Sequence, residues 1–372
     1  MHTTHILFSL LSGLIIALIS FNAYSNNFEL TPQVDGSSKE LNVTVSIAGN
    51  DAEAETGMIS VWEKDFTYPG SDYLRLHFSE IKKDADRFEI HISNRQGKKV
   101  QVIKSDEFTD STDIWSDLIN GTLIFVEVKA PASATFQFKI DRLVYQAVGS
   151  TPLSITLPDE REHIALYNSN ALIHKVQNAV AKLSLVKDNI PYVCTGFLLE
   201  NGRLLTNHHC ISEQQVCKNT VAIFGYQYTE QGDLLEGKQI ACDSIIEADY
   251  NLDYVLLKLK DDPDDSWGRL KWADNLLQDD EAIYIIEHPA GQPKQISIKG
   301  CKVGKAIVDG RIPESDFSHH CDTLGGSSGS PIFNMDGQVV GLHHYGFGSG
   351  LYWNTNRAVR GPLIKSAIKD IN

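Results

Sequence analysis

Three short segments, far apart in the chain, carry side chains that together could perform nucleophilic catalysis. Ser328 lies in GSSGSP, where small neighbours leave room for a substrate backbone. A serine hydroxyl is a poor nucleophile until an imidazole accepts its proton, and His209 in TNHHC is the candidate base. Asp253 begins the apolar run DYVLLKL, where a buried carboxylate can orient an imidazole and stabilise its charged form. These residues predict acyl transfer through a serine nucleophile.

The loop around the serine also offers donors for the negative charge that develops on an attacked carbonyl. Glycine at position 326 lets successive turns present the N–H groups of Gly326 and Ser328 towards one point, as an oxyanion hole. A similar serine elbow occurs in α/β-hydrolases, but it needs a strand-to-helix turn, and Pro331 blocks a helix here. Ser327 and Ser330 remain alternative nucleophiles to be tested.

Asp249 competes with Asp253 for the role of the acid. It lies among polar loop residues, whereas Asp253 stands at the start of an apolar strand. Either aspartate could simply serve a turn or a helix cap, as this residue type often does. The joint occurrence of the three segments favours Asp253.

These segments must be positioned mainly by β-structure, because short alternating runs with turn signals fill much of the chain. Residues 26–150 alternate apolar and polar positions, as in Tyr73–Phe78 and Phe136–Ile140. The Gly-containing loop Asn94–Gly97 is expected to join two strands as a hairpin. We predict that this region is a β-sandwich accessory domain without catalytic residues.

The alternation breaks within GSTPLSITLPDERE, whose glycine, prolines and charges are typical of a connection between domains. We assign residues 151–160 to this linker and residues 161–372 to a second domain. Pro362 opens a run with helical spacing, so a mostly β domain with a C-terminal helix is predicted. The strands expected before it are residues 192–199, 203–206, 253–259, 282–286 and 339–343.

The first 25 residues resemble an export signal. They hold an apolar run followed by the small-x-small site Ala23-Tyr24-Ser25, which predicts a signal peptide cleaved after Ser25. No later stretch of the sequence is apolar enough to cross a bilayer, so no stable membrane anchor is expected after cleavage. The sequence therefore predicts a secreted or periplasmic protein.

Charge and cysteine content narrow the range of partners. The net charge is −15 and basic residues are not clustered, which disfavours nucleic acid as a partner.

An even number of cysteines in an exported chain predicts three disulfides in an oxidising compartment. No C-x-x-C pair or metal-ligand spacing occurs, so neither a metal site nor another cofactor is expected. The six cysteines are Cys194, Cys210, Cys217, Cys242, Cys301 and Cys321.

In their order, LLTNHHC, DYVLLKL and GSSGSP resemble the signature segments of the trypsin and chymotrypsin superfamily, over about residues 165 to 370. GSSGSPIF and EHPAGQPKQI are most similar to bacterial trypsin-like peptidases and glutamyl endopeptidases. The resemblance implies an all-β fold, with a double β-barrel, and a secreted endopeptidase acting on proteins or peptides. It implies His209 as general base, Asp253 as its partner and Ser328 as nucleophile, with His208 and His288 outside the chemistry.

The resemblance also implies a disulfide between Cys194 and Cys210. Many other connectivities are open to six cysteines, and adjacency alone assigns Cys217–Cys242 and Cys301–Cys321. Family members activated by clipping carry an aspartate directly before the nucleophile, where it pairs with a new α-amino group. Ser327 stands at that position here, and a hydroxyl cannot neutralise a buried ammonium, so this activation switch is not expected.

Two specificities are compatible with the resemblance. Asp322, six residues before the serine, matches the pocket carboxylate of trypsin-like enzymes and implies cleavage after Lys or Arg. Thr323 and His343 match positions that hold a substrate carboxylate in glutamyl endopeptidases and imply cleavage after Glu. An ionised Asp322 in the pocket would repel a glutamate, so the two alternatives conflict. Gly346 and Gly348 are expected at the edge of the pocket.

Two functions of other classes stay open at this stage. A catalytically silent homologue could use the protease fold as a secreted protein-binding scaffold. An esterase would turn over esters without cleaving peptide bonds, although the chain lacks the α/β pattern of the common esterases. Labelling with a fluorophosphonate separates an active serine hydrolase from a scaffold.

Overall fold

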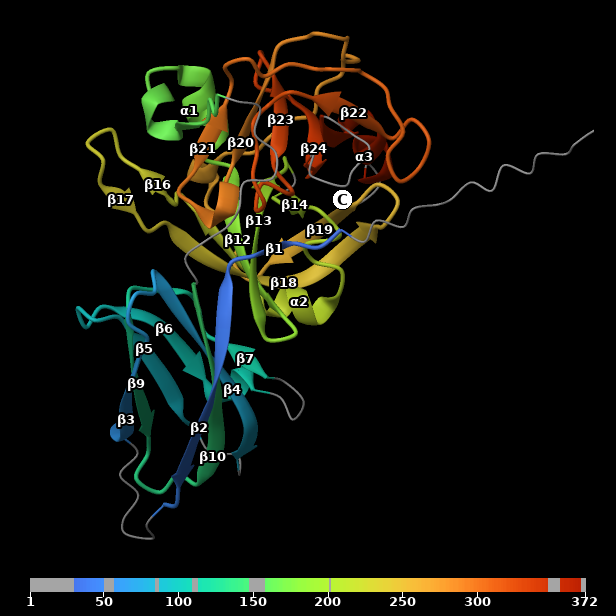
Figure 1. Ribbon diagram of the computed structural model, residues 1–372. Coiled ribbons are helices and arrows are strands. Elements are labelled where there is room, and N and C mark those ends of the chain that lie inside the picture. The colour runs from blue at the N-terminus through green and yellow to red at the C-terminus, as the bar shows by residue number, and fades with distance from the viewer. Residues whose placement is uncertain are drawn as a thin grey trace, which may run out of the picture. The chain divides into compact units, whose positions relative to one another are not determined.

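A computed structural model describes residues 30–49, 57–83, 87–108, 113–146, 158–200, 202–346 and 355–368. The predicted signal peptide and most of the predicted linker lie outside these residues, so their limits stay predictions. Strands dominate the fold, as the all-β prediction requires (Figure 1). Within the described ranges, no helix has the length and apolar character needed to span a membrane.

The accessory region consists of two antiparallel sheets that share one apolar core. Figure 1 shows them as the blue-to-teal part of the chain. The expected hairpin at Asn94–Gly97 is confirmed, since β5 and β6 pair on either side of it. One sheet contains β2 (Gly36–Ile47), β10 (Phe136–Gln146), β4 (Tyr73–Lys83), β7 (Ile114–Trp115) and β8 (Ile119–Asn120). The other contains β3 (Ile59–Thr67), β9 (Leu123–Ala130), β5 (Glu89–Ser93) and β6 (Lys99–Lys104).

This β-sandwich follows from the alternation seen in the sequence. Along β9, buried and half-buried side chains alternate strictly, so every second residue faces the core. Val126 and Val128 of this strand pack in the same cluster as Phe78 and Phe138 of the other sheet. The inward faces of both sheets therefore form a single core.

The first barrel presents His209 and Asp253. β13 pairs with both β12 and β14, which closes six strands into a ring. A short strand near the N-terminus, β1 (Gln33–Val34), pairs with β13 on the outside of that ring. The strands of the ring are β13 (Ile190–Leu198), β12 (Val180–Lys187), β15 (Val221–Phe224), β18 (Lys238–Asp249), β19 (Tyr254–Leu259) and β14 (Leu204–Thr206).

The second barrel carries the Ser328 loop. Two isolated bridges, Ala282 with Lys302 and Val303 with His319, connect the start of β20 to β22 through residues 302 and 303 and so close the barrel. The strands are β11 (Glu162–His163), β21 (Gln295–Ser297), β20 (Ile283–Glu287), β23 (Pro331–Asn334), β24 (Val339–Tyr345), β25 (Asn356–Arg360) and β22 (Asp316–His319). A small hairpin of β16 (Gln227–Tyr228) and β17 (Leu234–Leu235) stands apart from both barrels.

The helices are few and short. The predicted C-terminal helix is present as α3 (Gly361–Ile368), with Pro362 in its first turn. Two more helices, α1 (Ala171–Gln177) and α2 (Gln214–Lys218), were not expected. In α1 the signal is the N-cap, because the Asn170 side chain accepts hydrogen bonds from two backbone N–H groups of the first turn.

A continuous apolar core links the barrels. Leu183 and Phe197 of the first barrel belong to the same buried cluster as Tyr284, Phe333 and Leu342 of the second. Such a cluster fixes the two barrels against each other, since opening it would expose large apolar surfaces to water. The loops that carry the predicted catalytic residues are thereby attached to one rigid framework.

Candidate active site

Pairing of two strands brings His209 and Asp253 together. β14 ends just before His209, β19 begins just after Asp253, and Thr206 of β14 lies opposite Val255 of β19. The His209 Nδ1 atom lies 2.8 Å from Asp253 Oδ2, and the His209 backbone N–H donates to Asp253 Oδ1 at 3.0 Å. The Asn207 side chain donates to the Asp253 carbonyl at 2.9 Å. The imidazole is therefore oriented by both backbone and carboxylate, as a general base requires.

Asp253 is fully buried and adopts a left-handed backbone conformation with φ of +46°. Such a conformation is unfavourable for aspartate and persists only where surrounding contacts enforce it. Burial by itself would raise the pKa of Asp253, but the charge and hydrogen bond of His209 and the hydrogen bond of His344 lower it well below its usual value. The group is therefore a carboxylate at neutral pH.

Two cations beside Asp253 were not recognised in the sequence. The Arg311 Nη1 atom lies 3.3 Å from Asp253 Oδ1, and its guanidinium stacks on the ring of Tyr250. His344 Nδ1 lies 3.2 Å from Asp253 Oδ2, while its Nε2 lies 2.7 Å from Asp316 Oδ2. One signal was present: Asp316 is the first residue of a strand after a polar turn, and Asp253 directly precedes a strand.

The other polar residues near the triad have structural roles. Asp249 caps a turn, because its Oδ1 accepts the N–H groups of Asn251 and Leu252. The His208 ring packs edge-on against Tyr250. His288 is buried, with Nδ1 3.0 Å from the Gln292 carbonyl oxygen. A structural role was expected for His208 and His288, whereas Asp249 had been the alternative candidate for the acid and here accepts turn N–H groups instead.

Ser328 lies in a loop that Thr195 of β13 anchors. The Thr195 N–H donates to the Ser328 carbonyl at 2.8 Å, and its hydroxyl donates to the Gly326 carbonyl at 2.9 Å. The side chains of Ser327 and Ser330 are fully buried, whereas Ser328 is half-buried. Of the three serines, Ser328 is thus the one that a substrate can approach.

Glycine is required at position 326. Its φ is +97°, and a Cβ atom there would lie 3.0 Å from both the Ala290 nitrogen and the His288 carbonyl oxygen. In the described part of the chain, neither the Gly326 nor the Ser328 amide donates a hydrogen bond. Both amides are therefore available as donors to a negatively charged oxygen, as the predicted oxyanion hole requires.

The base and the nucleophile are not hydrogen-bonded to each other in this structure. Among the described residues, the hydrogen bonds of His209 run to Asp253 and none reaches Ser328. In apo enzymes such catalytic hydrogen bonds are often long and tighten only when substrate binds. The direct pairing of His209 with Ser328 therefore stays a prediction.

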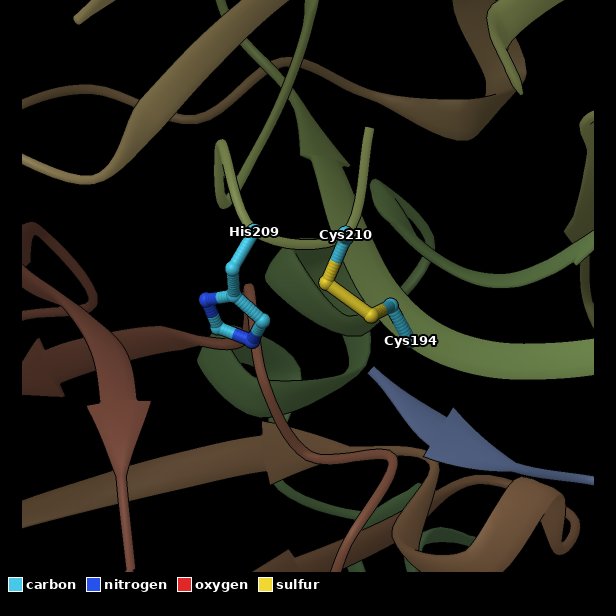
Figure 2. A group of neighbouring side chains, drawn as sticks. All are labelled: Cys194, His209 and Cys210. Atoms are coloured by element: carbon cyan, nitrogen blue, oxygen red, sulfur yellow. A yellow bond between two sulfur atoms is a disulfide. The ribbon is translucent and has the colours of Figure 1, made fainter. Parts of the chain in front are cut away.

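A disulfide lies beside the imidazole. Cys210 follows His209 directly and is bonded to Cys194 in β13 (Figure 2). A nitrogen of the His209 ring and the two sulfur atoms lie within 4.8 Å of one another. Because the sulfurs are bonded to each other, they do not offer two thiolates to a metal ion. The bond instead ties the loop that carries the base to a central strand of the barrel.

The other two disulfides join the pairs assigned by adjacency. Cys217 in α2 is bonded to Cys242 in β18, and Cys301 is bonded to Cys321 directly before Asp322. The three bonds lie within the two-barrel region. No described cysteine is free.

Asp322, the candidate partner for a basic substrate, is engaged by the protein itself. It is buried, and its Oδ2 accepts the backbone N–H of Glu160 at 2.9 Å. The negative charge of Asp322 acts on the neighbouring Arg161 guanidinium. That guanidinium donates two hydrogen bonds to Asp159, of 2.9 and 2.7 Å. The carboxylate therefore faces the segment that enters the second barrel.

Thr323 and His343, the candidate partners for an acidic substrate, are both buried. The Thr323 hydroxyl has no hydrogen-bond partner among the described residues. His343 Nδ1 lies 3.0 Å from His319 Nε2, and burial, followed by the repulsion of nearby histidines, lowers the pKa of His343 well below its usual value. Gly346 follows the end of β24, and Gly348 lies outside the described residues.

Glu287, at the end of β20, is a buried acid that the sequence analysis did not single out. Burial raises its pKa to about 8, against the lowering influence of the Ser327 hydroxyl and the Arg161 guanidinium. It therefore lies beside the position where clip-activated relatives carry an aspartate. The sequence signal was weak, because IIEHP places the glutamate at the end of an apolar run with no motif around it.

Comparisons with known proteins found the following similarities. The trypsin-like peptidase domain family matches residues 194–342, which include the positions of His209, Asp253 and Ser328. The secreted RxLR effector protein 73 of Plasmopara viticola is 28% identical over 302 residues, 74% of this chain and 75% of that protein. The glutamyl endopeptidase of Staphylococcus epidermidis is 23% identical over 229 residues, 59% of this chain and 76% of that protein. Among solved structures, the active form of the Rv3671c protease from M. tuberculosis has a TM-score of 0.43 and 18% identity, covering 61% of this chain and 93% of that one.

Proposed function

Since the chain belongs to the trypsin-like serine protease superfamily, we propose that it is a serine endopeptidase with His209, Asp253 and Ser328 as its catalytic triad. The observation that carries the proposal is the 2.8 Å contact between His209 Nδ1 and Asp253 Oδ2. This contact leaves the other ring nitrogen, Nε2, to accept a proton. The half-buried Ser328 supplies the nucleophile, and the two available amides of its loop supply the donors to the oxyanion.

In this proposal His209 Nε2 takes the hydroxyl proton of Ser328 as the oxygen attacks the substrate carbonyl. The amides of Gly326 and Ser328 stabilise the resulting oxyanion. The imidazolium then protonates the leaving amine, and the C–N bond breaks to give an acyl-enzyme. Water, deprotonated by His209, releases the acid product and restores the serine.

The contacts in the pocket region favour an acidic residue before the cleaved bond. The Asp322 carboxylate accepts a backbone N–H of Glu160, which supports a structural role for it. The Thr323 hydroxyl has no partner among the described residues, and Thr323 and His343 match the positions that hold a substrate carboxylate in glutamyl endopeptidases. Both side chains are buried here, so the proposal requires the pocket to open when substrate binds. A neutral His343 keeps one N–H as a donor, and a substrate carboxylate beside it would favour the protonated ring.

Labelling and peptide cleavage test the triad. We expect Ser328→Ala to abolish fluorophosphonate labelling and to lower peptide turnover by about 10⁴-fold or more. Ser330→Ala is the matched control, since its buried hydroxyl has no partner among the described residues. It should label and cleave like the native protein. Equal loss in both variants would contradict the assignment.

A random peptide library tests the specificity. We expect cuts after Glu, and we expect Thr323→Val to lower kcat/KM for such peptides by about tenfold or more, because valine keeps the shape and removes the donor. Asp322→Asn should leave the preference for Glu in place. Cuts after Lys or Arg that Asp322→Asn abolishes would overturn this part of the proposal.

The proposed enzyme acts outside the cytosol. Three disulfides are stable in an oxidising compartment. The Plasmopara viticola relative is named as secreted. These observations support the export that the N-terminal sequence predicts.

A catalytically silent homologue is the second candidate. In the described part of the chain, no hydrogen bond joins Ser328 to His209, and one relative is named as an effector and not as a peptidase. Native protein that neither reacts with a fluorophosphonate nor cleaves any peptide of the library would favour this candidate.

A further inference from the structure

His344 lies between two buried carboxylates. Its Nδ1 atom is 3.2 Å from Asp253 Oδ2, and its Nε2 atom is 2.7 Å from Asp316 Oδ2. The three side chains are almost completely shielded from water, with 3%, 0% and 0% of the surface of His344, Asp253 and Asp316 exposed. Asp253 Oδ2 is also the oxygen that contacts His209 Nδ1.

The geometry fixes the protonation of this imidazole. A neutral imidazole has one N–H and one lone pair, so one of its two nitrogens would direct a lone pair at a carboxylate oxygen. The imidazolium has two N–H groups and satisfies both carboxylates. The direction of the pKa shift agrees: burial lowers the pKa of His344, but attraction by Asp316 and hydrogen bonds to Asp253 and Asp316 raise it to about 9.

We propose that His344 is a positioning residue: an imidazolium, anchored by Asp316, that holds the Asp253 carboxylate in the orientation in which it receives His209. The inference rests on the proposed triad and adds a second histidine to it. His344 touches neither the substrate nor the reacting atoms, so it acts only through Asp253.

Both carboxylates that contact His344 also lie near arginines. Arg311, from the segment before β22, approaches Asp253 Oδ1 at 3.3 Å. Arg357, opposite Tyr345 in β25, interacts with the charge of Asp316. The histidines packed nearby add no positive charge at neutral pH, because burial, followed by neighbouring charges, lowers the pKa of His343 well below its usual value and that of His319 to about 3. The ionisable groups that surround His344 are Asp253, Asp316, Arg311, Arg357, His209, His319, His343 and Tyr345.

Loss of the His344 proton must therefore disturb the triad. Above about pH 9 one of the two carboxylates loses its N–H donor, because a neutral imidazole has a single N–H for two acceptors. If Asp253 loses the donor, its oxygen is free to turn away from His209. The proposal therefore predicts that the acylation rate falls at alkaline pH as His344 loses its proton.

Two near-isosteric variants separate the contacts. In His344→Asn the amide occupies the place of Nδ1, so the donor to Asp253 is kept and the contact with Asp316 is lost. In His344→Gln the amide reaches the place of Nε2, so the contact with Asp316 is kept and the donor to Asp253 is lost. Asp316→Asn leaves the imidazole in place but removes the charge that contributes most to raising its pKa.

The measurement is the second-order rate of acylation by a fluorophosphonate, from pH 6 to 10, in the full-length protein. We expect the native rate to decline with an apparent pKa near 9 and Asp316→Asn to move that decline to lower pH. At pH 7 His344→Asn should stay within about threefold of native and show no such decline, and His344→Gln should lose about tenfold or more. Identical profiles in native protein and Asp316→Asn, or equal rates in the two His344 variants, would overturn the inference.

Nitrogen NMR of the histidine side chains gives a readout that does not need activity. We expect the native His344 ring to carry protons on both nitrogens at pH 7.5, whether or not the protein reacts with the probe. A neutral His344 ring at that pH would overturn the inference even in an active enzyme. Absence of labelling in the native protein, with a doubly protonated His344, would instead count against the proposed function alone.

Discussion

Asp253 and Glu287 show two outcomes of burying a carboxylate. Asp253 is surrounded by His209, His344 and Arg311, and these partners keep it ionised in spite of its burial. Glu287 has weaker compensation, and burial raises its pKa to about 8. Near neutral pH the first residue is therefore a fixed negative charge, and the second is largely protonated.

The free energy of unfolding should depend on pH through Glu287. A glutamate in the unfolded chain loses its proton near pH 4.5, whereas Glu287 in the folded protein keeps it up to about pH 8, so stability falls as pH rises through that window. Glu287→Gln removes this loss, and we expect it to be more stable than native protein by roughly 1 to 3 kcal/mol at pH 7.5 but not at pH 4. Urea denaturation at both pH values measures the difference. The exposed Glu230→Gln is the control, and a gain of equal size at both pH values would contradict the account.

The proposed triad rests on the sequence because each member sits in a local pattern. The small residues around Ser328 and the apolar strand after Asp253 are visible within ten residues of the side chain. The role of His344 was not predictable in that way. Its two contacts span 91 and 28 residues of sequence and depend on how β24 and β22 pack in the barrel.

Among the elements, β13 determines most of the site. Its Thr195 anchors the Ser328 loop, and its Cys194 is bonded to the residue that follows His209. Both the proposed nucleophile and the proposed base are therefore attached to the same strand.

Removing the Cys194–Cys210 disulfide should affect chemistry as well as stability. The bond closes a loop of 16 residues, and its loss in Cys194→Ser/Cys210→Ser should cost about 3 kcal/mol of stability. We also expect acylation by a fluorophosphonate to slow by about tenfold, because the His209 loop loses its attachment. Cys217→Ser/Cys242→Ser is the matched control, with a similar loss of stability but little change in rate. Equal rates in the two double variants would show that the bond does not position the base.

Alternation of apolar and polar residues predicted the strands well, because strands such as β9 bury every second side chain. It failed for α1 and α2, which have seven and five residues. A helix this short shows hardly two turns of periodicity, and tertiary packing stabilises it more than its own sequence does. Only the Asn170 cap of α1 carried a local signal.

Over the whole molecule, the covalent cross-links are unevenly distributed. The three disulfides fall between Cys194 and Cys321, and the sequence of the accessory β-sandwich contains no cysteine. The sandwich therefore has no covalent cross-link and depends on its apolar core and strand pairing, whereas the barrels depend in part on an oxidising environment.

Reduction of the disulfides should consequently destabilise the barrels and leave the sandwich unchanged. In the presence of a thiol reductant, we expect hydrogen exchange to accelerate in β13, β15 and β18, since each disulfide contributes about 3 kcal/mol through loop closure. The strands β4, β9 and β10 should keep their protection. Faster exchange throughout both regions would show that the sandwich depends on the barrels for its stability.

The most direct test of the central claim is a crystal structure of the protein after reaction with a fluorophosphonate. The account predicts phosphorus bonded to Ser328 Oγ, His209 Nε2 within hydrogen-bonding distance of the adduct, and the phosphonyl oxygen bound by the amides of Gly326 and Ser328. An adduct on another residue, or one on Ser328 with the His209 ring turned away from it, would contradict the account.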